Sequence, residues 1–511
     1  MVILFIRYER SIKVSKIHST VSRRDFMKGL GLAGAGLGAA ASTTPVFHDM
    51  DELIASSGFS GSESYSRYPW WVKEVDKPTA EIDWNLMKPY DMRNSDKWAT
   101  PELLAKYYAA QLKHTKECIL NKTPGSSLKD YALFGGIKGS MMQNVAKVGT
   151  PEPNLEYLYP TDTLTSLGLP RYEGTPEENL KMCAAAIHLL GGRDISVVEV
   201  DDNVKKVLYS HSAMLMGGKP SRAIVWEDVD NAYETPEKMV IPNKCKWALV
   251  YSCPQSQLSR YQSVIMGKFG VFGAYSDIAV MDQRLQKFLR ILGYQGVLDG
   301  FGGGNSIGSN SGFGVLAGSG EIGRHDYVNS PSFGALMRMS QFILTDLPLA
   351  PTKPIDAGMW KFCQSCKKCA DMCPSGAISK EAEPTWEPTG VWNGTGRKLY
   401  PVDYPKCGPW RGMPPGGIGH IYEAGPGGCS NCQVVCVFTK TPKASIHDVI
   451  RPLVSSTSVF NSFFTTLDKS FHYGEAFVTP LGEVNVSPDE WWNRDLKTYP
   501  FKGRVMGDGW A

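Results

Sequence analysis

Apolar and polar residues recur along the chain with two periods, one typical of helices and one typical of strands. Residues 101–120 form an amphipathic helical pattern that begins after Thr100, a residue type that caps helix N-termini. Thr175-Pro-Glu-Glu gives the same start, with Pro176 at the first helical position. We predict that this second helix ends near Gly191-Gly192. Residues 281–292 carry apolar side chains at 281, 285, 288, 289 and 292, which predicts a third helix.

Short runs rich in β-branched and aromatic residues predict strands at 195–200, 223–226 and 247–252. Strands that alternate with helices favour an α/β core. Between Ser330 and Leu349 we expect a helix followed by an extended segment. These elements account for most of the chain ahead of its cysteine-rich region.

Residues 300–320 are rich in glycine, and we expect these glycines to let backbone amides approach a large ligand. The alternative is a disordered loop, but the stretch also carries apolar residues such as Phe301 and Phe313. Gly318-Ser-Gly-Glu-Ile-Gly323 matches G-x-G-x-x-G, which is a weak indication without a preceding strand and a following helix. No P-loop Gly-Lys-Ser/Thr is present.

The cysteines carry the most specific pattern in the chain. Cys363-Gln-Ser-Cys366-Lys-Lys-Cys369-Ala-Asp-Met-Cys373-Pro has the C-x2-C-x2-C-x3-C-P spacing of bacterial ferredoxins, which bind [4Fe–4S] clusters. Three thiolates of such a loop bind one cluster, and the fourth points to another. A second group follows, so we predict one cluster on Cys363, Cys366, Cys369 and Cys436, and the other on Cys373, Cys407, Cys429 and Cys432. The long gap after Cys407, and Val437 in place of a proline, depart from the ferredoxin pattern.

Two other uses of these cysteines are disfavoured. A structural zinc site takes four ligands, usually in two pairs, and eight cysteines exceed that number. Disulfides suit exported proteins, but pairs within a C-x2-C-x2-C loop would be strained. The remaining cysteines are scattered, and we expect them to be small buried residues: Cys118, Cys183, Cys245 and Cys253.

The N-terminal region predicts export. Ser22-Arg-Arg-Asp-Phe-Met-Lys28 is typical of a twin-arginine motif, and the Gly/Ala-rich run 29–41 follows, too short and too weakly apolar to span a membrane. We therefore predict a signal peptide over residues 1–41 and a Ser/Gly-rich linker over 42–65. Because an apolar run precedes the basic region, we expect translation to begin at Val14 rather than Met1.

Charge and hydropathy argue against nucleic-acid binding and against a membrane-spanning segment beyond the signal peptide. The chain of 511 residues has a net charge of +3, while residues 1–41 hold seven Lys/Arg and two Asp/Glu, which leaves −2 for the remainder. No basic stretch lies beyond the signal peptide, so nucleic acid is not an expected partner. No apolar run beyond it reaches the ~18 residues of a membrane span.

In this order, the pieces resemble the respiratory reductive dehalogenases over nearly the whole chain: the twin-arginine signal, the segment from Ser263 to Tyr294, the glycine-rich stretch, Thr345-Asp-Leu-Pro-Leu349 and the two cysteine groups. The resemblance implies an α/β nitroreductase-like core over residues 66–355 that holds a base-off corrinoid (a cobamide). It also implies a ferredoxin-like domain with two [4Fe–4S] clusters over 356–445. The segment 446–511 carries Trp491, Trp492, Trp510 and several Phe, and this apolar content predicts that it packs back on the core. No D-x-H-x-x-G motif occurs, so no histidine ligand to cobalt from that motif is expected.

The family's reaction replaces the halogen of an organohalide by hydrogen in organohalide respiration, with two electrons and one proton. Its site residues map onto Tyr275 as proton donor, Arg338 as the cation that stabilises the phenolate, and Asn305 as a contact of the tyrosine or substrate. Corrinoid contacts map onto four residues: Ser306, Asn310, Ser311 and Gly312. The sequence leaves alternatives open. Tyr275 could be a buried core tyrosine, in which case Tyr261 or Tyr294 would be the proton donor. Arg338 could form a salt bridge with Asp346 instead.

The resemblance further implies a twin-arginine translocase during export, and a small integral membrane protein that anchors the chain at the outer face of the cytoplasmic membrane. Two rival functions remain at this stage. An epoxyqueuosine reductase is similar in cofactors and core, but it is cytosolic and acts on tRNA. A corrinoid-free, exported iron–sulfur electron-transfer protein would not need roughly 300 residues ahead of its clusters.

Overall fold

The computed structural model of the chain describes residues 68–94, 97, 100–128, 130, 170–212, 221–260, 265–298, 307–411, 429–439, 446–470 and 488–493. The predicted signal peptide and linker lie outside these residues, as do Asn305, Ser306 and Tyr261. The strands are β1 (Lys73–Glu74), β2 (Arg193–Glu199), β3 (Ala223–Glu227), β4 (Tyr233–Glu234), β5 (Lys238–Pro242), β6 (Trp247–Pro254), β7 (Glu321–Ile322), β8 (Val328–Asn329), β9 (Met337–Thr345) and β10 (Ile355–Asp356).

The α-helices are α4 (Pro101–Leu120), α6 (Pro176–Leu189), α7 (Gly267–Ile291), α8 (Asn310–Ala317), α9 (Met359–Cys366), α10 (Lys368–Asp371), α11 (Tyr404–Arg411), α12 (Asn431–Val434), α13 (Ile446–Ser456), α14 (Asn461–Ser470) and α15 (Pro488–Trp492). Short 3-10 helices are η2 (Met92–Asn94), η3 (Val204–Val207) and η4 (Gln257–Arg260). The described part of the chain is therefore a mixed α/β fold.

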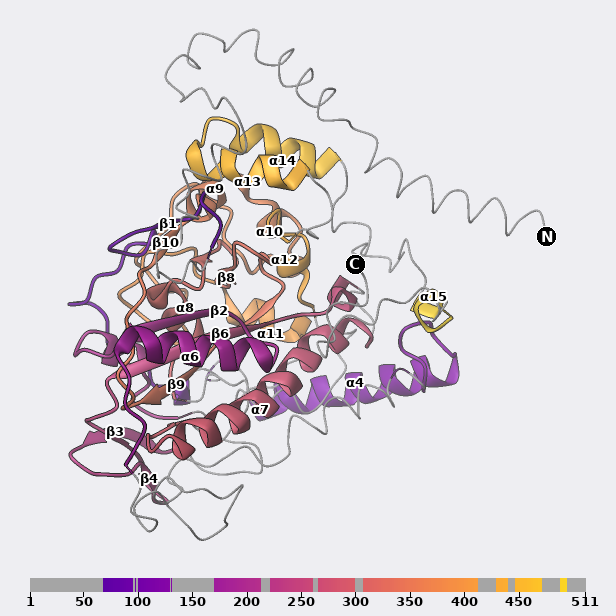
Figure 1. Cartoon of the computed structure of the whole chain (residues 1–511). Helices are drawn as coiled ribbons and strands as arrows, with labels where there is room; N and C mark the ends of the chain where they lie inside the picture. The colour runs from indigo at the N-terminus through magenta and orange to yellow at the C-terminus, as the bar shows by residue number, and fades with distance from the viewer. Residues whose placement is uncertain are drawn as a thin grey trace, which may run out of the picture.

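The central sheet has the order β2-β6-β9, and both of its pairings are antiparallel. Successive side chains of a strand point to opposite faces. Accordingly, Leu249 and Ile343 pack with α6 and α7 on one face, whereas Val250 and Leu344 pack with α8 on the other. The result is three layers, with the long helix α7 along one face of the sheet (Figure 1).

The predicted helix starts at Thr100 and Thr175 are confirmed. The Thr100 Oγ1 accepts a hydrogen bond from the Leu103 amide at 3.2 Å. At Thr175 a capping box forms, because its hydroxyl accepts from the Glu178 amide at 3.2 Å and the Glu178 carboxylate accepts from the Thr175 amide at 2.9 Å. The third predicted helix is also present, but α7 begins at Gly267, well before residue 281.

The helix predicted after Ser330 is wrong, because residues 337–345 form β9. Met, Gln and Leu suit a helix as well as a strand, so local composition does not decide between them. The main chain instead pairs with β6 in a register that runs from Thr345 opposite Trp247 to Met337 opposite Pro254. Apolar layers on both faces of this strand outweigh its local preference.

The glycine-rich stretch contains a helix that the sequence analysis did not predict. The Ser309 hydroxyl caps α8 by accepting from the Gly312 amide, and Gly318 ends the helix with a φ of 84°. A Cβ added to Gly320 would lie 2.2 Å from the Asn329 carbonyl oxygen. The G-x-G-x-x-G match therefore reflects a helix end and a close approach of β7 to β8, not a dinucleotide site.

The N-terminal and cysteine-rich regions share a hydrophobic core. β1 pairs with β10, and an isolated bridge joins Ile82 to Arg397. Ala80, Val315 and Trp360 belong to one buried cluster. Residues on both sides of the boundary predicted near residue 355 thus contribute to one buried cluster.

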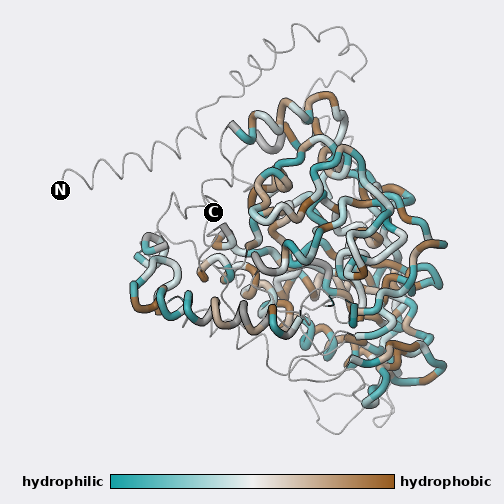
Figure 2. The backbone as a smooth tube through the Cα atoms, turned by 180° about the vertical axis from the view of Figure 1, so that it is seen from behind, coloured by the Kyte–Doolittle hydropathy of each residue, from teal (hydrophilic) through white to brown (hydrophobic). Residues whose placement is uncertain are grey.

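The C-terminal helices contact both regions. Val454 on α13 and Phe464 on α14 pack against Phe362 on α9, and these helices lie beside α9 in Figure 1. Trp491 on α15 instead contacts Phe269 on α7, with ring centroids 6.3 Å apart. Hydrophilic and hydrophobic residues are interspersed along the described backbone (Figure 2). None of the described helices is both long and apolar enough to cross a membrane.

Candidate functional site

The structure brings Tyr275 and Arg338 together. Tyr275 lies on α7 and Arg338 on β9, opposite Cys253 of β6. The Arg338 Cζ lies 5.0 Å from the centroid of the Tyr275 ring, and both residues are half-buried. A guanidinium at this distance stabilises negative charge that develops on the ring system.

Gln433 connects this pair to the cysteine-rich region. The Arg338 Nη2 donates to the Gln433 Oε1 at 3.4 Å, and the Gln433 Nε2 donates to the Ala335 carbonyl at 3.1 Å. Gln433 is buried on α12 and directly follows Cys432 in the sequence. The sequence analysis missed it, although its place within the second cysteine motif could have drawn attention to it.

The Arg338 Nε is buried and has no hydrogen-bond acceptor among the described residues. The guanidinium therefore has a donor available for a group that binds in front of it. A salt bridge to Asp346 is excluded, because the two residues are eight positions apart on an extended strand, about 27 Å. Asp346 instead accepts from the Gln295 amide at 2.6 Å and lies 3.9 Å from the Lys244 Nζ.

Tyr294 belongs to a different part of the fold. It follows the C-terminal end of α7, and that end, at Ile291, is about 24 Å along the helix from Tyr275. Its hydroxyl donates to the Tyr172 carbonyl at 2.6 Å, and its side chain is buried. Burial raises the pKa of Tyr294, with a smaller opposing effect from Arg171. Tyr294 therefore does not share a site with Arg338.

Three predicted corrinoid contacts lie in the first turn of α8. Asn310 is buried there, and Ser311 and Gly312 are half-buried. A Cβ added to Gly312 would lie 2.6 Å from the Val207 Cγ1, so close packing against η3 is sufficient to explain this glycine. The contact of these residues with a corrinoid stays a prediction.

One predicted cysteine set converges around the junction of α9 and α10. Cys363 and Cys366 lie on α9, Lys367 adopts a left-handed conformation with φ 47°, and Cys369 follows on α10. Burial raises the pKa of Cys363 and of Cys369 well above the usual thiol value, and neighbouring thiols that include Cys436 raise it further. Four buried thiols so close together suit iron, whose positive charge stabilises the thiolates.

The second set lies next to the first. Cys373, Cys407 and Cys432 pack around one apolar cluster that includes Val402 and Val435. The helix α11 brings Cys407 to this cluster in spite of the long gap that follows it in the sequence. Cys429 is half-buried just before α12, and Cys432 also contributes to the raised pKa of Cys369.

None of the twelve cysteines forms a disulfide. Within the described ranges no three His, Cys, Asp or Glu side chains converge as they would on a single metal ion. A cubane differs from such a site, because each thiolate binds a different iron. The grouping of the eight cysteines into two sets therefore remains the prediction that these observations support.

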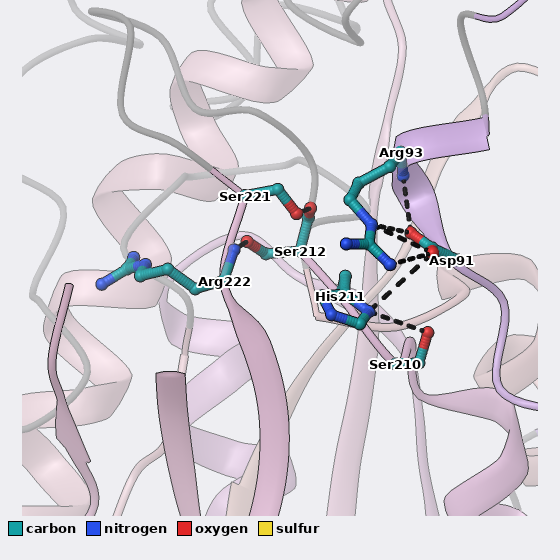
Figure 3. A network of polar contacts seen from close by, with 7 residues as sticks. All are labelled: Asp91, Arg93, Ser210, His211, Ser212, Ser221 and Arg222. Carbon is teal, nitrogen blue, oxygen red and sulfur yellow. Dashed lines mark hydrogen bonds and ion pairs between the residues drawn. The ribbon is translucent and has the colours of Figure 1, made fainter. Parts of the chain in front are cut away.

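A separate set of polar contacts involves residues 91, 93, 210–212, 221 and 222 (Figure 3). The Arg93 Nη2 donates to the Asp91 carboxylate at 2.6 Å, and this contact lowers the pKa of Asp91. The His211 Nδ1 lies 3.3 Å from the Ser210 Oγ and 3.9 Å from the Asp91 Oδ2. A catalytic triad needs serine and aspartate on opposite ring nitrogens. Because both approach Nδ1 here, the network is not a hydrolytic site.

Asp277 on α7 is a partly buried carboxyl group whose burial affects the stability of the fold. Its Oδ2 is buried without a hydrogen-bond partner among the described residues, and burial raises the pKa of Asp277 to about 6. A raised carboxyl pKa destabilises the fold once pH rises above the unfolded value near 3.8, and the full cost is present above about 6. We expect Asp277→Asn to increase the free energy of unfolding at pH 7.5 by about 2 kcal/mol.

Denaturant unfolding at several pH values measures this effect. The advantage of Asp277→Asn should stay constant from pH 7.5 down to about 6 and then shrink as pH falls from about 6 towards 4, because the carboxyl of the folded protein becomes protonated in that range. Asp346→Asn is the matched control, and no gain is expected there because that carboxylate already accepts from the Gln295 amide. An advantage of Asp277→Asn that is independent of pH would contradict the prediction.

Comparisons with known proteins agree on one family. Residues 67–349 match the family model for the reductive dehalogenase subunit. The chain is 30% identical to a chloroethene reductive dehalogenase of Dehalococcoides mccartyi strain VS, over 96% of this chain and 99% of that protein. It is 28% identical to a trichloroethene reductive dehalogenase of Dehalococcoides mccartyi strain ATCC BAA-2266 / KCTC 15142 / 195, over 93% and 97%.

The fold is similar to that of a solved reductive dehalogenase whose structure suggests a mechanism for B12-dependent dehalogenation. The TM-score is 0.52 at 17% identity, over 85% of this chain and 54% of that one. The chain thus spans about half the length of that solved protein, and the likeness concerns the fold alone.

Proposed function

The chain belongs to the reductive dehalogenase family and is an oxidoreductase, and on this premise we propose that it carries out R–X + 2e⁻ + H⁺ → R–H + X⁻ on a small organohalide in organohalide respiration. The observation that carries the proposal is the guanidinium of Arg338, 5.0 Å from the ring of Tyr275, joined through Gln433 to the cysteine-rich region. A proton donor, its stabilising cation and an electron-transfer region thereby adjoin one another.

The eight cysteines of the two sets are proposed to hold two [4Fe–4S] clusters, and their chemistry as donors fits that assignment. A base-off cobamide is the proposed third cofactor, with Ser306, Asn310, Ser311 and Gly312 as its contacts. The available Nε of Arg338 fits a site in which a bound group supplies an acceptor. When bound, these cofactors supply one-electron transfer and a reduced cobalt centre for cleavage of the carbon–halogen bond.

The proton that the reaction consumes is proposed to come from a side chain of this protein. The Tyr275 hydroxyl gives its proton to the carbon that loses the halide, and a phenolate remains. Because the pKa of a tyrosine in water is near 10, that phenolate needs a neighbouring positive charge, which Arg338 supplies. Gln433 keeps the guanidinium in place. Asn305 is proposed to orient the tyrosine or the substrate.

The finer fold assignment belongs to this proposal. We infer a nitroreductase-like core over residues 66–355 and a ferredoxin-like domain over 356–445, with the segment 446–511 packed back on the core. The antiparallel β2-β6-β9 sheet between helices supports the first assignment, and the gathered cysteines on α9, α10, α11 and α12 support the second. The shared cluster of Ala80, Val315 and Trp360 indicates that the two units fold together.

Localisation and partners follow from the same premise. We propose export by the twin-arginine translocase, cleavage after residue 41, and attachment to the outer face of the cytoplasmic membrane through a small integral membrane protein. Release of the protein from membranes by a salt wash tests the attachment. N-terminal sequencing of the released protein tests the cleavage site.

The central experiment is cofactor analysis of anaerobically purified protein, followed by a dehalogenation assay with reduced methyl viologen. We expect one cobalt and about eight irons with matching acid-labile sulfide per chain, and halide release from a panel of chlorinated and brominated alkenes, alkanes and arenes. Eight irons without cobalt, in protein made where corrinoid is supplied, would favour the electron-transfer rival. Activity on epoxyqueuosine in tRNA, without halide release from any organohalide, would favour the epoxyqueuosine reductase rival.

A further inference from the structure

Arg324 is a buried cation beside the first cysteine set. It lies between β7 and β8, and its side chain is 1% exposed. Its Nε donates to the Cys363 carbonyl at 3.0 Å, and its Nη2 donates to the Gln364 carbonyl at 3.1 Å. The guanidinium thus binds the main chain of the C-x2-C loop from inside the protein.

The remaining contacts of Arg324 are also neutral. Its Nη1 donates to the carbonyls of Ser379 and Glu381 at 2.9 and 2.8 Å. Its Cζ lies 3.6 Å from the centroid of the Tyr400 ring. Carbonyls and a ring face satisfy the donors of the guanidinium, but they do not neutralise its charge.

A buried charge without a counter-ion is costly. In the described part of the chain no carboxylate forms a salt bridge with Arg324. Neighbouring cations differ in this respect: Lys368, which lies within the cysteine motif, is paired with Asp468 at 2.5 Å, and Arg397 lies 3.8 Å from Asp326. The positive charge of Arg324 is therefore available to another negative group nearby.

The closest candidate for that group is the first cysteine set. The Arg324 Nε donates to the carbonyl of Cys363 itself, and its Nη2 donates to the carbonyl of the next residue, so the positive charge lies against the main chain of this cysteine loop. Four thiolates around a cubane outweigh the charge of its irons and sulfides, so the assembly is anionic. A fixed cation beside it offsets that charge in an environment of low dielectric constant.

We propose that Arg324 is the fixed counter-charge of the iron–sulfur cluster bound by Cys363, Cys366, Cys369 and Cys436, and that it raises the reduction potential of this cluster. This inference rests on the proposed function, which places a cluster there. Reduction adds one electron from an external one-electron donor, takes [4Fe–4S]²⁺ to [4Fe–4S]⁺ and involves no proton. Because the reduced form carries one more negative charge, a nearby cation stabilises it more than the oxidised form.

The test is an EPR-monitored redox titration of the dithionite-reduced protein, with iron counted in each sample. In Arg324→Gln the ratio of reduced to oxidised first cluster should fall about tenfold at a fixed ambient potential, which corresponds to 59 mV for a one-electron couple. Arg324→Lys retains the charge and should recover most of the shift. The cluster on the other four cysteines serves as an internal reference and should shift less.

Arg222→Gln is the matched control, because Arg222 is a buried arginine that pairs with Glu234 in the separate β3-β5-β4 sheet. It should destabilise the fold and leave both cluster potentials unchanged. An unchanged potential in Arg324→Gln, or equal shifts in Arg324→Gln and Arg324→Lys, would overturn the proposal. The role of Arg324 would then be limited to its hydrogen bonds with the main chain.

If Arg324→Gln does not retain its irons, Ser379→Asp replaces it. This variant keeps Arg324 and adds a carboxylate to the residue whose backbone carbonyl accepts from the Arg324 Nη1. It should lower the potential in the same direction, and no shift would then overturn the proposal. The titration needs neither corrinoid nor turnover. A protein that binds both clusters but lacks dehalogenase activity would therefore refute the proposed function and still test Arg324.

Discussion

Replacing Tyr275 by phenylalanine is expected to lower kcat for dehalogenation by about 10²–10⁴-fold, the range that a positioned proton donor contributes. The substitution removes only the hydroxyl. The ring keeps its edge-to-face contact with Phe272, at 6.2 Å between centroids, and its place beside the Arg338 guanidinium. Cobalt and iron contents should therefore match those of the wild type. Halide release under reduced methyl viologen measures the effect.

Tyr294→Phe is the matched control for this experiment. It removes a hydroxyl from a buried tyrosine near the other end of the same helix, where the lost hydrogen bond to the Tyr172 carbonyl affects stability. We expect a small loss of stability, about 1 kcal/mol, and an almost unchanged kcat. If Tyr275→Phe retains full activity with full cofactor content, Tyr275 is not the proton donor.

The second large effect is expected at the first cysteine set. Cys369→Ala should remove one cluster, so that about four of eight irons remain, and should abolish dehalogenation because electrons no longer pass through the chain of cofactors. Cys369 is buried, and its thiol interacts with Cys363, Cys366 and Cys436. Iron and sulfide analysis together with EPR of the reduced protein measures the loss.

Cys183→Ala is the control for a generic loss of a buried thiol. Cys183 lies on α6 in the apolar layer against the central sheet, and burial raises its pKa to about 12, as expected for an inert core thiol. Its replacement should retain all irons. Full iron content in Cys369→Ala would show that this residue is not a cluster ligand.

The two cysteine sets can be predicted from the sequence as cluster ligands, because ligand spacing in a tight loop is a local property; the clusters themselves stay a prediction. The same holds for the helix starts at Thr100 and Thr175, since a capping hydroxyl and the amide that it accepts from are three residues apart. Family resemblance then singled out Tyr275 and Arg338 and the overall reaction. Their roles stay predictions until the variants are measured.

Other features are contacts between residues far apart in the sequence, and local patterns do not contain them. Residues 337–345 are a strand only because β6 offers them a partner and apolar layers cover both faces. Gly312 and Gly320 have neighbours, Val207 and Asn329, that no spacing rule would indicate.

The capped helices and the family follow from the sequence, and the sequence also predicts the cysteines as cluster ligands. Only the tertiary structure decided that Arg338 contacts Tyr275 rather than Asp346, that Gln433 connects the pair to the cysteines, and that Arg324 is buried without a carboxylate partner in the described part of the chain. The physical reason is that spacing within one segment fixes local geometry, whereas the partner of a buried charge depends on which distant segments pack beside it.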